Sequence, residues 1–152
     1  MCYILYMASE KVRPLIPFDP DHRTLSVQEP GAYGGNIRTQ FGKPHVYELG
    51  SDQGCGCGFA REHDWMNEDP EQLAATRGNQ ERLSRYLAAC LEDEDSLELH
   101  GCWNGDEDQP PLRHREITPQ DLLGERFHFI EKEHIIVKRS HAGATPNPAT
   151  NS

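Results

Sequence analysis

The segment of this sequence best suited to chemistry is Gly54-Cys55-Gly56-Cys57-Gly58-Phe59. Glycine tolerates positive φ, so the backbone here could aim both sulfur atoms at one side. The two thiolates could then bind a metal, form a strained disulfide, or include one nucleophile whose pKa is lowered by backbone N–H groups. The competing interpretation is a tight turn that hides both cysteines against the core, because free cysteine often behaves as a small buried hydrophobe. The residue types favour the turn and leave the chemical roles open.

A zinc ion bound by this pair would need further ligands, and His100 and Cys102 are the best candidates. They stand two residues apart on one predicted strand, so their side chains share a face and could join Cys55 and Cys57 in a four-ligand site. The C-x-C and H-x-C spacings differ from the standard zinc spacings. Two other histidines have less support as ligands, His45 and His63. Zinc is therefore a hypothesis, and the simplest expectation is a chain without a cofactor.

Catalytic signatures in the chain are few. Arg61-Glu62-His63-Asp64 follows the cysteine segment, and a cysteine beside a histidine is the minimal nucleophile and base, but such a charged run is more often a solvated loop. The run Asp106-Glu107-Asp108 lacks the ligand spacing and glycine of a calcium loop, so we expect a solvated turn there. The motifs of phosphate-binding loops, dinucleotide-binding folds, α/β-hydrolases and zinc peptidases are missing. The sequence therefore favours a non-enzymatic protein.

Length and charge bound the class of protein. The chain has 152 residues, enough for one domain that folds without a staple, which we place at residues 1–139 with a disordered tail over 140–152. The net charge of -10 argues against a nucleic-acid partner, because duplex binding needs clustered cations. We expect no membrane partner, since no apolar run approaches the length of a spanning helix. Five cysteines without a secretory leader indicate the reducing cytoplasm.

Hydrophobic patterning predicts an α+β fold. We expect about five strands in a mostly antiparallel sheet, packed on one main helix at 69–92, with the 54–59 loop at one edge or end of the sheet. Asp69 and Pro70 are good signals for the start of this helix, and Gly78 is a weak point within it. The predicted strands are 2–8, 24–28, 45–50, 97–103 and a final pair at 127–130 and 135–137, and a short capped helix is predicted at 118–123.

Three segments together resemble a group of small bacterial proteins of unknown function: Met1-Cys2-Tyr3, Tyr47-Glu48-Leu49-Gly50-Ser51 and Gly54-Cys55-Gly56-Cys57-Gly58-Phe59. The resemblance covers the first part of the chain, to about residue 60, and the Thr118-Pro119 segment. It implies a bacterial cytosolic source and transfers no activity to any residue.

Two functions therefore stay open. The sequence favours a small binding or interaction module whose partner is an unknown protein or small molecule, with Gly54, Gly56, Gly58 and Phe59 shaping the contact loop. The alternative is a cysteine-centred protein that uses Cys55 and Cys57 for metal binding or thiol redox chemistry.

Overall fold

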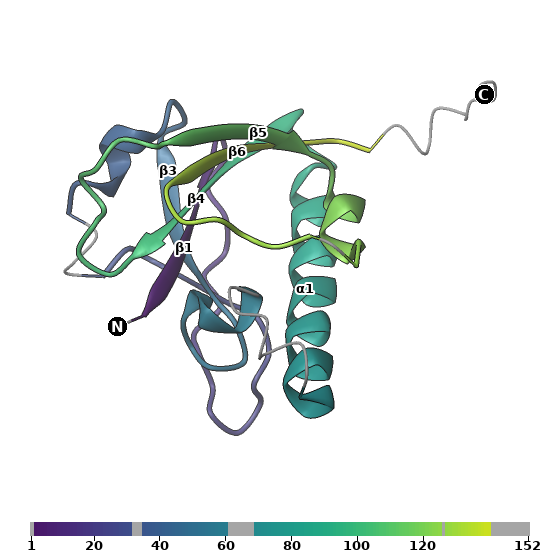
Figure 1. Ribbon diagram of the computed structural model, residues 1–152. Coiled ribbons are helices and arrows are strands. Elements are labelled where there is room, and N and C mark those ends of the chain that lie inside the picture. The colour runs from purple at the N-terminus through teal and green to yellow at the C-terminus, as the bar shows by residue number, and fades with distance from the viewer. Residues whose placement is uncertain (1, 32–34, 61–68, 126, 141–152) are drawn as a thin grey trace.

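The computed structural model describes residues 2–31, 35–60, 69–125 and 127–140. In chain order the elements are β1 (Tyr3–Ser9), β2 (Ser26–Gln28), η2 (Ile37–Gln40), β3 (His45–Gly50), η3 (Gly56–Phe59), α1 (Pro70–Cys90), β4 (Ser96–Trp103), β5 (Arg113–Ile117), η5 (Pro119–Leu123) and β6 (Glu133–Lys138). Within these residues the strands form one six-stranded sheet in the order β2-β3-β1-β4-β6-β5, and α1 covers one of its faces (Figure 1). The predicted α+β class is confirmed, with six strands where we expected about five.

β1 is a central strand, as its unbroken run of apolar residues predicts. It pairs antiparallel with β3 on one side and with β4 on the other. All seven of its residues are buried, because both faces of the sheet are covered. The face toward α1 carries the main core, to which β1 contributes Tyr3, Leu5 and Met7. Ile4, Tyr6 and Ala8 alternate with them and join a second, smaller cluster on the opposite face.

The main helix begins and ends close to the predicted positions. The Asp69 carboxylate accepts hydrogen bonds from the backbone N–H groups of Glu71 and Gln72, and Pro70 occupies the first turn. The helix then continues through Gly78 without a break to Cys90. Its buried side chains include Leu83 and Leu87, which pack in the main core, so tertiary packing outweighs the low helix propensity of one glycine.

The C-terminal part of the sheet differs from the predicted hairpin. Residues 127–130 form no strand, although Phe127 and Phe129 alternate as in one. Both rings instead pack in the main core, edge to face, with centroids 5.0 Å apart. The partners of β6 are β4, in antiparallel, and β5, in parallel. β5 was not predicted, because Ile117 is its single apolar residue and the strand lies at the edge of the sheet.

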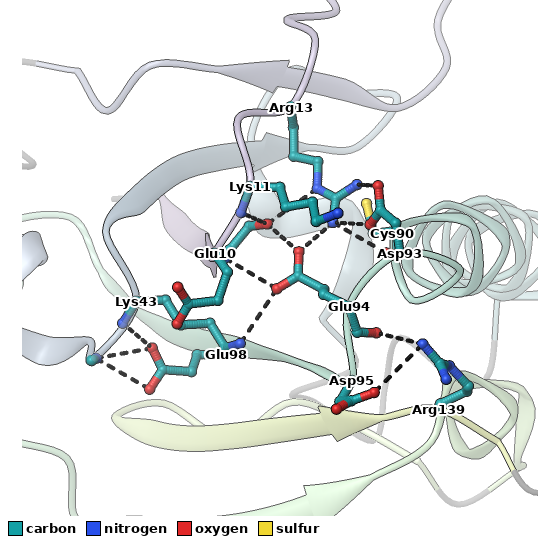
Figure 2. A network of polar contacts seen from close by, with 12 residues as sticks. Glu10, Lys11, Arg13, Lys43, Cys90, Asp93, Glu94, Asp95, Glu98 and Arg139 are labelled. Atoms are coloured by element: carbon teal, nitrogen blue, oxygen red, sulfur yellow. Dashed lines mark hydrogen bonds and ion pairs between the residues drawn. The ribbon is translucent and has the colours of Figure 1, made fainter.

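A buried network of charged side chains fastens the segment after α1 to the sheet (Figure 2). The Glu94 carboxylate, 5% exposed, accepts hydrogen bonds from the Ser9 hydroxyl and the Arg13 guanidinium. Lys43 Nζ lies 3.3 Å from the same carboxylate, and Arg13 also pairs with Asp93 at 2.8 Å. Burial alone would raise the pKa of Glu94, but the hydrogen bonds outweigh burial, so its pKa lies below the ordinary value.

The predicted tail lies almost entirely outside the described residues, which end at Ser140. Among the described residues, no helix combines the length and the apolar character needed to cross a membrane.

Candidate metal-binding site

Three cysteine side chains meet where β3 ends. Cys55 and Cys57 come from the glycine-rich segment and the start of η3, and Cys2 immediately precedes β1. Their Sγ atoms all lie within 4.8 Å of one another. Cys55 and Cys57 are half-buried, whereas Cys2 is exposed. The structure therefore brings the predicted pair together and adds a third sulfur that the sequence analysis did not propose as a ligand.

Ser51 organises the loop that carries the pair. Its backbone N–H and its hydroxyl both donate to the Cys55 carbonyl oxygen, each at 2.7 Å. The same hydroxyl oxygen accepts from the backbone N–H groups of Gln53, at 3.2 Å, and Gly58, at 3.1 Å. Ser51 is fully buried, so these hydrogen bonds are shielded from competing water. One side chain thus closes the loop on both sides of Cys55.

The helix α1 holds the loop from the other side. Its buried Asn79 accepts from the backbone N–H of Asp52, at 3.0 Å, and donates to the Asp52 carboxylate and the Gly58 carbonyl. Gln80 donates to the carbonyl oxygen of Phe59 at 3.2 Å. The Phe59 ring is fully buried in the main core. These contacts fix the loop before any ligand arrives, which is the condition for a preorganised site.

β1 contacts the loop directly. The pairing of β1 with β3 runs from Ser9 to Leu5, and beyond it the Tyr3 backbone N–H donates to Cys57 Sγ at 3.3 Å. A β-carbon on Gly56 would lie 2.8 Å from both Leu5 N and Tyr3 O, so glycine is needed for this close approach. At this end of β1, a cysteine sulfur thus accepts the hydrogen bond that a backbone carbonyl of a neighbouring strand would otherwise accept.

The glycines act differently from the prediction. Gly54 has a positive φ of 84° and lies under the Phe18 ring. Gly56 and Gly58 belong to η3, and no positive φ is found at either. The 3-10 turn η3 therefore brings the two sulfurs to one side. Of the three glycines in this segment, only Gly54 uses the positive φ that the sequence predicted.

The contact loop that we expected from Gly54, Gly56, Gly58 and Phe59 is mostly covered. Gly56, Gly58 and Phe59 are buried and only Gly54 is partly exposed. Phe59 therefore anchors the loop in the core, and the partly exposed residues of this segment are Gly54, Cys55 and Cys57.

Burial controls the chemistry of Cys55. Burial raises the pKa of this thiol to about 12, because its effect is larger than that of the hydrogen bond from the Cys57 backbone N–H, which lowers the pKa. A thiol of this kind is a poor nucleophile at neutral pH, because the thiolate is the reactive form. The proposed base, His63, lies outside the described residues. Burial of the Cys55 thiol therefore opposes nucleophilic attack by this residue at neutral pH.

The structure places His100 and Cys102 away from the cysteine group. On β4 they alternate with Leu99, which faces α1, so both lie on the opposite face of the sheet, and both are fully buried. Burial, with His134 nearby, lowers the pKa of His100 to about 4, and burial raises the pKa of Cys102 to about 12. Their shared face was predicted, but it is not the face of the cysteine loop.

The other predicted candidates also have defined places. His45 begins β3, at the end of that strand far from the loop. Glu107 belongs to the acidic run expected to be a solvated turn, yet it is 2% exposed. Its carboxylate accepts from the Tyr6 hydroxyl at 2.8 Å and from the Gly105 backbone N–H at 2.9 Å. Its role in the described structure is thus to satisfy a buried hydroxyl.

Comparison of the chain with protein-family models, with curated proteins and with solved structures gives no match. The geometry and chemistry of the three sulfurs are therefore the basis on which we assign a function.

Proposed function

We propose that this protein binds a thiophilic metal ion, of which Zn²⁺ is the first candidate, through Cys2, Cys55 and Cys57. The observation that carries the proposal is the convergence of three sulfur atoms within 4.8 Å. Around a tetrahedral Zn²⁺, with Zn–S bonds of about 2.3 Å, sulfurs lie about 3.8 Å apart, so closure on the ion needs movements of about 1 Å. The exposed Cys2 can supply most of this movement.

The surroundings of the sulfurs support this function. The Tyr3 N–H that points at Cys57 Sγ is the kind of outer hydrogen bond that orients a metal thiolate and offsets its charge. An all-sulfur set selects soft or borderline ions such as Zn²⁺ and Cu⁺ over Mg²⁺ and Ca²⁺. Three sulfurs also leave one position of a tetrahedral ion for water or another ligand. The metal would therefore sit at the surface with one accessible side.

Thiol redox chemistry has less support. A reactive dithiol pair needs one thiolate at neutral pH, and the raised pKa of Cys55 makes this residue a poor choice for that role. The interaction module expected from the sequence, with an unknown protein or small molecule as its partner, stays a prediction.

The test is metal analysis of reduced, tag-free protein after equilibration with Zn²⁺ and removal of loose ions. We expect one Zn²⁺ per chain, and Co²⁺ in its place should show sulfur-to-cobalt charge-transfer absorption. The triple variant C2S/C55S/C57S should lose the ion. Cys2→Ser alone should weaken binding by about tenfold or more, because removal of even an outer-shell partner costs that much.

The matched control is Cys102→Ala, a buried cysteine on the other face of the sheet, which should keep the ion. Absence of a saturable site, or equal binding by the wild type and the triple variant, would refute the proposal. Equal binding by the wild type and Cys2→Ser would show that the third sulfur takes no part.

A further inference from the structure

The face of the sheet opposite α1 carries three histidines side by side. In the strand register His114 of β5 pairs with His134 of β6, and His134 pairs with His100 of β4. The row continues to Tyr6 of β1, which pairs with His100. Residues directly opposite one another point to the same face, and Tyr6 belongs to the cluster on the face away from α1. Three imidazoles from three adjacent strands therefore line one strip of the sheet.

The row leads from solvent into the interior. His114 is exposed, the His134 side chain is 14% exposed and His100 is fully buried. The His114 and His134 rings have centroids 5.6 Å apart. Phe41 closes the inner end, with its ring centroid 6.3 Å from both the His100 and the His134 rings. A small ion entering beside His114 would meet one imidazole after another.

His100 has an unexplained feature. Neither Nδ1 nor Nε2 has a hydrogen-bond partner among the described residues, although both atoms are buried. An unpaired buried polar group destabilises the fold, because it has given up its hydrogen bonds to water. Such a group in a folded protein needs an explanation, and a bound water or ion is a common one. The neighbour in register with this ring is another imidazole, which makes an ion shared by the two rings a good solution.

His134 is oriented by a carboxylate. Its Nε2 lies 3.4 Å from Glu98 Oε1. Glu98 is itself held in place, since it accepts hydrogen bonds from the backbone N–H groups of Gly42 and Lys43. A histidine that directs one ring nitrogen to a carboxylate keeps the lone pair of the other nitrogen for a metal, as metal-ligating histidines generally do. Here that nitrogen is Nδ1.

We propose that His100, His134 and His114 form a second metal site, for a borderline divalent cation of the Zn²⁺, Ni²⁺ and Cu²⁺ class that imidazole favours. The site is independent of the cysteine group, which lies at the end of β3. Among the described residues, the cysteine group is the one set whose ligand atoms already lie within 4.8 Å of one another. The ring nitrogens of the three histidines do not all lie this close to one another, so binding of an ion requires the rings to rotate toward it. Rotation costs little for the exposed His114.

The probe is Cu²⁺ added to the folded variant C2S/C55S/C57S, in which the cysteine site is removed. We expect one saturable equivalent by calorimetry and hyperfine coupling to three nitrogens in the electron paramagnetic resonance spectrum. His114→Asn, at an exposed position, should keep the fold and weaken Cu²⁺ binding by about tenfold or more.

The control is His22→Asn in the same background, since His22 is an exposed histidine that contacts the Asp19 carboxylate. It should bind Cu²⁺ as its parent does. The proposal is overturned if no equivalent saturates, if His114→Asn and His22→Asn bind equally well, or if the spectrum shows two nitrogens or fewer. Water alone at His100 would give the first of these outcomes. The His100 ring is left unchanged, so the nitrogen count does not depend on a variant that unfolds.

Discussion

Replacing Gly56 with alanine should weaken metal binding although Gly56 is not a ligand. The added β-carbon would lie 2.8 Å from Leu5 N and from Tyr3 O. Both are backbone atoms of a central, fully buried strand, so they cannot move aside as the end of a flexible side chain can. The loop and η3 must move away from β1 instead, which lengthens the hydrogen bond from the Tyr3 N–H to Cys57 Sγ.

The size of the effect follows from the cost of overpacking. One extra methyl group in a well-packed site costs about 1 to 3 kcal/mol. If the ion binds only after the loop returns to its position against β1, the free energy of metal binding becomes less favourable by the same amount. At 1.4 kcal/mol for each factor of ten, the metal affinity should fall by about 5- to 150-fold.

The assay is competition of each protein with a chromophoric chelator for Zn²⁺, together with urea unfolding of the metal-free proteins. The matched control is Gly78→Ala, whose β-carbon would approach only the Arg82 side chain, at 3.5 Å or more. This helix-interior change should raise the free energy of unfolding by about 1 kcal/mol and leave the affinity unchanged. Wild-type affinity and stability in Gly56→Ala would show that close packing against β1 does not hold the site.

Three further predictions test the contacts that hold the fold together. Glu94→Gln leaves the Arg13 charge without its buried partner and should lower the free energy of urea unfolding by about 3 kcal/mol. The control Asp95→Asn, at a 99% exposed side chain, should change this free energy little. The lowered pKa of Glu94 means that its carboxylate stabilises the fold above the unfolded pKa and that this contribution is lost as pH falls through the folded pKa. Acid titration below pH 4.5 should therefore destabilise the wild type more steeply than Glu94→Gln. Leu99→Ala, in the main core, should cost about 2 to 5 kcal/mol in thermal or urea unfolding, and Leu112→Ala, at a 73% exposed position, less than about 0.5 kcal/mol.

Local signals account for the parts of the fold that the sequence predicts well. The apolar run of β1 depends on burial of both faces of this strand, and the run reports that burial directly. The start of α1 was visible because Asp69 and Pro70 satisfy needs of the first helical turn alone. Such features require knowledge of neighbouring residues only.

The composition of the cysteine group could not be read from local patterns. The strand β1 could have paired with any other strand, so nothing in the sequence placed Cys2 beside Cys55 and Cys57. The histidine row depends in the same way on strand order, which joins β4, β6 and β5 across large separations in the chain.

The hydrogen bond between Tyr3 and Cys57 spans 54 residues, and the loop is held by α1 as well as by β1. The hydrogen bonds from Asn79 and Gln80 to the loop can therefore form only after the ribosome has released much of the helix. Long-range contacts of this kind form late, after the entropy of closing the intervening chain has been overcome. Under the proposed function, uptake of the ion would mark the completion of folding, and a nascent or misfolded chain would hold it poorly.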